Sequence, residues 1–253
     1  GIHPAKELEK APEWREILRA QLGPGDRKKV VIDHTPFESL LTSIGLGLVK
    51  LMAKVLFRLE VRGMENIPER GPYIIAPNHV SYLDGFCVGA SLPIRTIRDL
   101  YTLGVQNYFR GIPGKIFARL ANVIPIDAEA YLSKALQMSS YVLGKGKALM
   151  VFPEGGRSFD GSLVEFKKGV GILSRELNVP VIPTYIAGAF EALPRGAFLP
   201  RFRKIRITYG APLFPSDLDF TKKPEGVDDY QFFANQLRES VRKLGQAVRH
   251  STT

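Results

Sequence analysis

The side chain best placed for proton transfer in this sequence is that of His79. It closely follows an apolar run that predicts a strand, Tyr73–Ala76, and ligands of open α/β sheets bind at the carboxyl ends of strands. Asp84 lies five residues further on and has two roles open to it. It can orient the imidazole, or it can be the acid of a capping box whose N-cap is Ser81. On one continuous helix the two side chains would point roughly 140° apart, so they meet only if the chain turns between them.

A second group of reactive side chains lies in the segment Phe152–Ser158, again directly after an apolar run. Gly155 and Gly156 allow a tight loop whose backbone can face an anion. Arg157 can hold a phosphate through two parallel hydrogen bonds. Glu154 can form an ion pair with Arg157, or it can bind substrate hydroxyls or position the arginine. The segment therefore predicts an anion-binding loop.

Positive charge is in excess throughout the chain. Lys and Arg number 35 against 25 Asp and Glu, which gives a net charge of +10 and indicates a nucleic acid, a phospholipid surface or a phosphorylated substrate as partner. Lys167 and Lys168 add charge near the predicted loop, or form a solvated turn. The basic residues lack the interleaved aromatic side chains of nucleic-acid modules. A further basic cluster is either a patch that binds a lipid surface or a solvated face of the protein; it comprises Arg195, Arg201, Arg203, Lys204 and Arg206.

Several kinds of site are excluded by composition. The single cysteine, Cys87, rules out a disulfide framework and a multi-cysteine zinc site, and its apolar surroundings predict a packing role. No Walker loop occurs, and Gly45-Leu46-Gly47 lacks the third glycine of a dinucleotide fingerprint. No serine lies in a Gly-x-Ser-x-Gly elbow, which argues against Ser81 as a nucleophile. We expect neither a bound metal nor a resident cofactor.

The elements that position these residues alternate between short apolar runs and helical patterns. This alternation predicts an α/β fold with a mixed, largely parallel sheet flanked by helices. The predicted strands are 73–76, 123–126, 148–152, 181–186 and 205–209, and the predicted helices are 112–120, 130–143, 169–177 and 229–249.

A long apolar segment, residues 37–60, predicts an amphipathic helical extension on the N-terminal side. Either it packs on the core, or it lies in a membrane interface with its basic residues near lipid phosphates. Its longest uncharged stretch, Ser39–Val49, has eleven residues, which suits an interfacial helix better than a bilayer crossing. The apolar stripe consists of Leu41, Ile44, Leu48, Leu51 and Val55, and the basic stripe of Lys50, Lys54 and Arg58.

We divide the chain into four segments on these patterns. Residues 1–36 form an N-terminal arm whose start does not resemble a signal peptide, and residues 37–60 form the amphipathic helix. Residues 61–215 form the main domain, and residues 216–253 a polar linker and a C-terminal amphipathic helix.

Taken together, the two motifs resemble those of the glycerolipid acyltransferases, the family typified by 1-acylglycerol-3-phosphate acyltransferase. Asn78-His79-x4-Asp84 comes first and Phe152-Pro-Glu-Gly-Gly-Arg-Ser158 some seventy residues later, and the resemblance spans roughly residues 60–215. It implies that His79 and Asp84 are catalytic, and that Glu154, Gly155 and Arg157 bind the acceptor. We add Asn78, Gly156 and Lys168 as substrate-binding candidates.

The chain departs from the family in its middle motif. Ala128 stands where the family places an arginine that helps to hold phosphate, in Asn122–Ala128. Arg119 or Lys115, on the preceding predicted helix, are candidates to replace it. The departure favours a lysophospholipid or other polar lipid over lysophosphatidic acid as the acceptor.

The resemblance also implies a reaction. His79 takes the proton of an acceptor hydroxyl, and that oxygen attacks the thioester of acyl-CoA or acyl-carrier protein with no covalent intermediate. We expect a peripheral or monotopic enzyme on the cytoplasmic face of an anionic membrane, with no nucleic-acid partner. The alternatives are an acyl-thioesterase or lipase-like hydrolase and, in another class, a basic module that binds anions or nucleic acid.

Overall fold

The computed structural model of the chain describes residues 14–32, 35–109, 111–126 and 132–250. Within them lies a sheet of seven strands in the order β1-β7-β6-β2-β5-β3-β4. Every neighbouring pair is parallel except β6 and β7, which confirms the predicted α/β fold with a largely parallel sheet. In sheet order the strands are β1 (Glu60–Arg62), β7 (Arg206–Tyr209), β6 (Val181–Ala187), β2 (Tyr73–Pro77), β5 (Ala148–Met150), β3 (Leu100–Val105) and β4 (Val123–Ile126).

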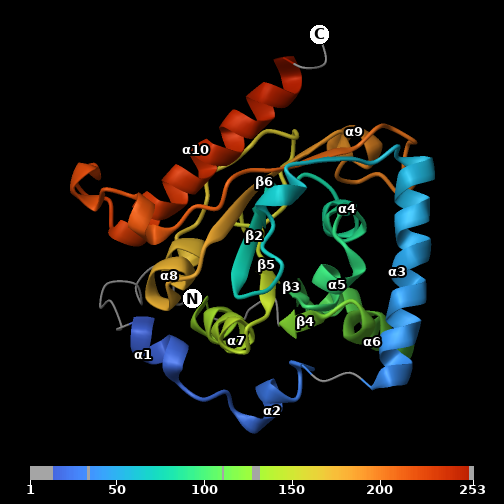
Figure 1. Cartoon of the computed structure of the whole chain (residues 1–253), viewed down its shortest axis with the longest axis horizontal. Coiled ribbons are helices and arrows are strands. Elements are labelled where there is room, and N and C mark those ends of the chain that lie inside the picture. The colour runs from blue at the N-terminus through green and yellow to red at the C-terminus, as the bar shows by residue number, and fades with distance from the viewer. Residues whose placement is uncertain (1–13, 33–34, 110, 127–131, 251–253) are drawn as a thin grey trace.

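The sheet is covered by helices on both faces (Figure 1). One face carries α1 (Trp14–Arg19), α7 (Leu132–Gly144), α8 (Gly169–Leu177) and α10 (Asp229–His250). The other side carries α4 (Asp84–Ser91), α5 (Ile94–Arg98), α9 (Ala189–Ala192) and α3 (Pro36–Leu56). The remaining elements are α2 (Pro24–Arg27), α6 (Gly111–Leu120), and the 3-10 turns η2 (Met64–Asn66), η3 (Gln106–Phe109), η4 (Pro215–Asp217) and η5 (Phe220–Lys222).

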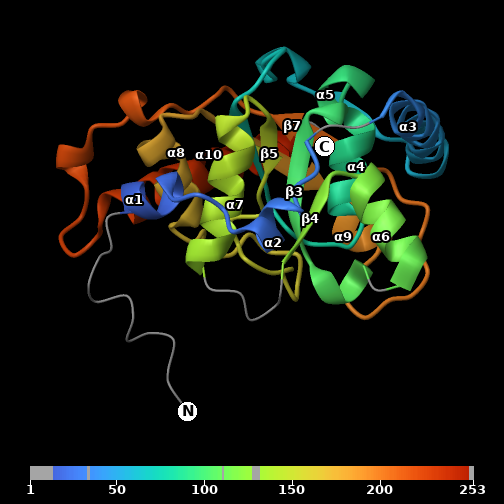
Figure 2. The ribbon, with the colours of Figure 1, turned by 90° about the horizontal axis from the view of Figure 1, so that it is seen from below.

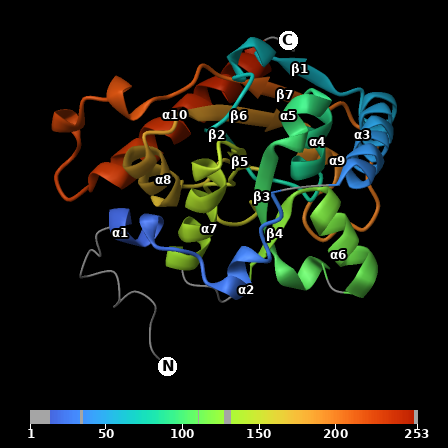
Figure 3. The same ribbon diagram turned by 60° about the horizontal axis from the view of Figure 1, so that its bottom comes forward.

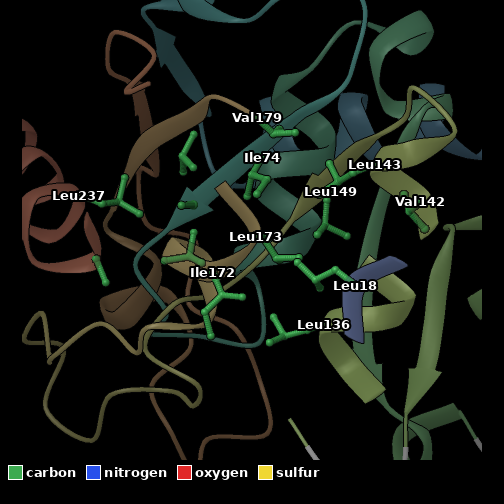
Figure 4. Packing of buried hydrophobic residues seen from close by; sticks show 14 of the residues in the cluster. Leu18, Ile74, Leu136, Val142, Leu143, Leu149, Ile172, Leu173, Val179 and Leu237 are labelled. Atoms are coloured by element: carbon green, nitrogen blue, oxygen red, sulfur yellow. The ribbon is translucent and has the colours of Figure 1, made fainter. Parts of the chain in front are cut away.

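The central strand β2 is apolar at every position because both of its faces are buried. Ile74 and Ala76 pack into the cluster beneath α7, α8 and α10, whereas Tyr73 and Ile75 pack into the cluster beneath α4. Figure 4 shows the first cluster, where Ile74 lies among side chains from β5, α1, α7, α8 and α10. Two cores thus hold β2, and hence the residues that follow it, in place.

The terminal segments contribute to this core. Trp14 and Leu18 of α1 are buried against α7, and α10 packs on β6 and α8 through Phe233, Leu237 and Val241. In Figure 3, α1 and α10 lie on the same side of the molecule as α7 and α8. The boundaries placed at residues 36/37, 60/61 and 215/216 stay predictions.

Five predicted strands and four predicted helices are present, with ends shifted by up to two residues where they are described. The helix predicted over residues 37–60 is also present, but it runs from Pro36 to Leu56, and Glu60 belongs to β1. The predictions missed β1, whose three residues are mostly charged, and β3, whose pattern is interrupted by Gly104. The helix after β2 begins at Asp84 rather than near Ser81. Cys87 is fully buried on that helix, as predicted, and burial raises the pKa of its thiol to about 12.

The helix α3 stands at the rim of the molecule (Figure 1), and Figure 2 shows it almost end-on. It begins at an N-cap, Thr35, which forms a capping box with Glu38. It contacts α4, α5 and α6, but its apolar stripe faces outward: Ile44 is 56%, Leu48 58% and Leu51 59% exposed. The core-facing alternative is therefore wrong for this stripe.

The basic stripe of α3 does not act as one surface. Lys50 turns inward and donates a hydrogen bond to the carbonyl oxygen of Leu92, whereas Lys54 and Arg58 are exposed. By length and composition, α3 is the one helix among the described residues that could cross a membrane, and only 6% of its apolar window is buried.

Candidate active site

The loop after β2 is anchored by Asn78. Its side-chain Oδ1 accepts the backbone N–H of Ile186 at 2.7 Å, and its Nδ2 donates to the carbonyl of the same residue at 3.2 Å. Asn78 is only 3% exposed. The amide that we predicted to bind substrate is thus engaged with β6, the neighbour of β2, and fixes the start of the loop.

His79 and Asp84 lie together, five residues apart in sequence. The distance from His79 Nδ1 to Asp84 Oδ2 is 2.8 Å. Asp84 Oδ2 also accepts the backbone N–H groups of Val80 and Ser81, at 2.7 Å and 2.8 Å. The chain between residues 78 and 83 is not helical, so the turn that the pairing requires is present.

Of the two roles left open by the sequence, Asp84 takes that of holding the imidazole. It also accepts the N–H of Ser81, but the predicted capping box is wrong, because α4 begins at Asp84 with Leu83 as its N-cap and has no side-chain cap hydrogen bond. Ser81 completes the turn, because its hydroxyl accepts the N–H of Leu83 at 3.1 Å and donates to the carbonyl of Leu193 at 2.8 Å. Asp84 itself is fully buried.

The loop of residues 152–158 holds His79 from the other side. Glu154 Oε1 accepts the backbone N–H of His79 at 2.8 Å, and the N–H of Ser158 donates to the carbonyl of His79 at 2.8 Å. The ring of Phe152 stacks on the imidazole, with centroids 3.9 Å apart. With Nδ1 turned to Asp84, the other ring nitrogen, Nε2, is available on a side chain that is 21% exposed.

Glu154 occupies an unusual position for a carboxyl group. It is only 5% exposed, and it makes no ion pair with Arg157. Its second oxygen accepts a weak hydrogen bond from the N–H of Val164 at 3.4 Å. Burial raises the pKa of Glu154 to about 7, opposed by its two backbone hydrogen bonds and aided by the charge of Asp84. Of the alternatives for Glu154, the geometry matches a positioning role, but toward His79.

Arg157 lies near the C-terminal end of the 152–158 loop. Its guanidinium stacks on the ring of Tyr82 at 3.4 Å, and it forms no ion pair with any acid in the described part of the chain. Gly155 has a left-handed φ of 73°, and a Cβ there would lie 2.8 Å from the side chain of Lys167, so the loop requires glycine. Gly156 is exposed beside it.

Lys168 points to a different part of the molecule. Its ammonium group is 3.1 Å from Asp228 Oδ2, just before α10.

The middle-motif position Ala128 lies outside the described residues. Of its suggested replacements, Arg119 binds Glu38 at 2.5 Å and so ties α6 to α3, whereas Lys115 lines a cleft of about 490 Å³ with Lys28 and Lys29.

Three contributions were not foreseen from the sequence: the stacking of Phe152, the backbone bond of Ser158 and the platform of Tyr82. All three residues lie inside or beside the two motifs. The sequence offered one signal for the ring under Arg157, namely the aromatic residue Tyr82 between His79 and Asp84. The basic cluster at 195–206 does not act as one patch of free charge, because Lys204 and Arg206 form ion pairs with Glu60. No group of three potential metal ligands occurs among the described residues.

Comparisons with known proteins point to one family. The family described as Acyltransferase matches residues 58–187. A 1-acyl-sn-glycerol-3-phosphate acyltransferase of Limnanthes alba is 30% identical over 202 residues, which cover 76% of this chain and 67% of that protein. The 1-acyl-sn-glycerol-3-phosphate acyltransferase alpha of Mus musculus is 34% identical over 144 residues, covering 54% of this chain and 49% of that protein.

The fold has a counterpart among solved structures. The crystal structure of PlsC, the 1-acyl-sn-glycerophosphate acyltransferase of Thermotoga maritima, superposes with a TM-score of 0.62 at 24% identity, covering 83% of this chain and 86% of that one. The chain thus spans from about half to two thirds of the length of these curated relatives and most of the length of PlsC.

Proposed function

Because this chain belongs to the Acyltransferase family and is an O-acyltransferase of the glycerolipid type, we propose that it moves a fatty acyl group from an acyl thioester to the free hydroxyl of a lysophospholipid. The names of its relatives support 1-acylglycerol 3-phosphate as the acceptor. The observation that carries the proposal is the 2.8 Å pair of His79 and Asp84 at the end of β2, held against the loop that bears Arg157.

The catalytic step follows from the two ring nitrogens of His79. Asp84 accepts a hydrogen bond from Nδ1–H, which keeps the proton on Nδ1 and leaves the lone pair of Nε2 for the acceptor hydroxyl. As the hydroxyl proton passes to Nε2, the oxygen attacks the thioester carbonyl and forms a tetrahedral intermediate. The intermediate collapses, the C–S bond breaks, and the thiolate takes the proton from Nε2. The buried carboxylate of Asp84 stabilises the transient imidazolium.

Acceptor recognition rests on Arg157. Its guanidinium is unpaired within the described residues and held flat by Tyr82, so it can bind a phosphate through two parallel hydrogen bonds. The exposed Gly156 allows close approach of the backbone to the ligand. Glu154 and Asn78 act indirectly, by holding His79 and its strand.

We place the enzyme on a membrane surface through the outward apolar stripe of α3. The face is that of an interfacial helix, since Leu48, Leu51 and Val55 are 58%, 59% and 65% exposed. Lys54, also exposed, can meet anionic headgroups. The orientation that we propose is peripheral or monotopic on the cytoplasmic face, where both acyl-CoA and acyl-carrier protein are available as donors.

The test is a two-way panel of acyl-CoA and acyl-carrier-protein donors against lysophospholipid acceptors, read by lipid mass. We expect diacyl product with 1-acylglycerol 3-phosphate, and a loss of about 10²–10⁴-fold in the His79→Ala enzyme at unchanged thermal stability. Thioester consumption that does not require an acceptor would instead favour a hydrolase. His79→Ala enzyme with wild-type transfer would contradict the mechanism.

Nucleic-acid binding is the alternative from another class. The pairing of Lys204 and Arg206 with Glu60 reduces the basic surface that such binding would use. Filter binding of DNA under salt titration separates the two classes, and tight, steeply salt-dependent retention would support the nucleic-acid module.

A further inference from the structure

A second guanidinium lies beside Arg157, from a segment remote in sequence. Nη1 of Arg195 donates a hydrogen bond to the backbone carbonyl of Arg157 at 3.3 Å. The guanidinium of Arg195 stacks on the ring of Phe159 at 3.9 Å, much as that of Arg157 stacks on Tyr82 at 3.4 Å. The loop of residues 152–159 and the segment after α9 thus present one arginine each, and each guanidinium is supported by an aromatic ring of that loop or of the His79–Asp84 segment.

The segment that carries Arg195 is anchored to the catalytic loop. The carbonyl oxygen of Leu193 accepts the buried hydroxyl of Ser81 at 2.8 Å, and Ser81 lies between His79 and Asp84. The carbonyl of Ala192 accepts the N–H of Arg201 at 2.7 Å, which closes the loop that follows. Arg195 therefore needs little further ordering of its backbone before it meets a ligand.

Neither arginine is neutralised locally. Within the described residues, no carboxylate lies within ion-pair distance of Arg157 or Arg195. The acids of the same loop are engaged elsewhere: Glu154 holds the backbone of His79, and Asp160 accepts hydrogen bonds from Ser158 and Ser162. Both guanidiniums, carried by neighbouring segments, therefore retain their charge for an anionic ligand.

We propose that Arg195 is a second phosphate-binding residue of the acceptor site, and that with Arg157 it selects a phosphomonoester over a phosphodiester. This rests on the proposed function. A terminal phosphate carries about −1.5 to −2 charges at pH 7, whereas the diester phosphate of a lysophosphatidylethanolamine carries one. Two cations match the charge of a phosphomonoester, so the pair favours 1-acylglycerol 3-phosphate, against the preference inferred from Ala128.

The steady-state test compares Arg195→Gln with a matched control, Arg203→Gln, which removes an exposed arginine from the same loop. At saturating donor we expect the KM for 1-acylglycerol 3-phosphate to rise about 10- to 100-fold in Arg195→Gln, with kcat within about twofold of wild type. The KM for 1-acylglycerophosphoethanolamine should rise severalfold less. The variant Phe159→Leu, which removes the stacking ring, should give an intermediate rise.

Three outcomes would overturn the assignment: an unchanged acceptor KM, an equal rise for both acceptors, or an equal effect of Arg203→Gln. A rise in the KM of the donor alone would place the phosphate of acyl-CoA, not that of the acceptor, at Arg195. If the wild-type enzyme transfers to no lysophospholipid, the proposed function fails, and a binding experiment decides on Arg195 separately. Calorimetric titration with glycerol 3-phosphate should then show binding that Arg195→Gln weakens and Arg203→Gln leaves intact.

Discussion

The buried carboxyl group of Glu154 accepts the backbone N–H of His79 at 2.8 Å, across 75 positions of sequence. The bond joins the two motifs directly. It fixes the backbone of the catalytic candidate from the loop that also carries Arg157. Proton transfer and acceptor binding are therefore coupled in position, since any shift of the 152–158 loop moves His79 with it.

We predict a pH dependence of stability from Glu154. Its pKa is raised by burial from 4.5 to about 7, so the folded chain keeps the proton in a range where the unfolded chain has lost it. The free energy of unfolding should therefore fall as pH rises from about 4.5 to about 7, by at most about 3.5 kcal/mol at ~1.4 kcal/mol per pKa unit. Urea titrations at a series of pH values measure it.

The variant Glu154→Gln should lack this fall, because the amide does not ionise. Glu165→Gln removes an exposed carboxyl from the same loop and is the matched control. Parallel pH curves for wild-type and Glu154→Gln protein would show that Glu154 is not the group responsible.

We predict that Asp84→Asn separates the two roles of Asp84. The asparagine oxygen can still accept from His79, Val80 and Ser81, while its amide nitrogen replaces Oδ1, a buried oxygen without a hydrogen bond among the described residues. The unpaired amide should cost about 1–3 kcal/mol of stability. Without the negative charge the imidazolium is no longer stabilised, and kcat should fall on the order of 10²-fold or more.

Kinetics and urea unfolding of the same Asp84→Asn preparation measure both effects. Asp160→Asn, an exposed acid of the 152–168 loop, should leave kcat near wild type. A wild-type kcat in Asp84→Asn would show that the carboxylate only holds the backbone of Val80 and Ser81.

We predict that the apolar stripe of α3 provides membrane affinity. Replacing Ile44, Leu48 and Leu51 by serine removes side chains that are more than half exposed and leaves the core untouched. Partitioning to vesicles should fall on the order of 100-fold or more, because each buried methylene contributes about 0.8 kcal/mol. Vesicle flotation measures the change.

A matched control replaces three exposed apolar residues elsewhere, Leu132, Val164 and Phe214, by serine. Equal loss of flotation in both triple variants would contradict a specific role of α3. Lys54→Glu should weaken binding to anionic vesicles severalfold while sparing neutral ones. Lys50 is unsuitable for that test, because it is bonded to the carbonyl of Leu92.

We predict that Gly171→Ala strongly destabilises the fold. A Cβ at this position of α8 would lie 2.1 Å from the carbonyl oxygen of Tyr230, so α8 and α10 would have to separate. A cost of about 2 kcal/mol or more follows from overpacking of this kind. Gly169→Ala, on the same helix, meets only side-chain carbons at 3.6 Å and 3.7 Å and should be nearly neutral in thermal unfolding.

Local patterns in the sequence are enough to predict the candidate site residues and most of the elements that bear them. The strand before His79 is an apolar run, the turn before Asp84 is marked by Ser81, and the glycines of the 152–158 loop reflect local backbone geometry. Each of these signals depends on neighbours within a few positions. Spacing along the chain is therefore enough to predict it.

The contacts that those residues make depend on the tertiary structure. Glu154 turns to the backbone of His79, Lys168 turns to Asp228, and Arg195 reaches the carbonyl of Arg157 across 38 positions. These contacts depend on the placement of β5 and β6 on either side of β2, and on the packing of α10 against α8. Local periodicity does not specify strand order, because the pairing of remote strands is selected by the burial of the whole core.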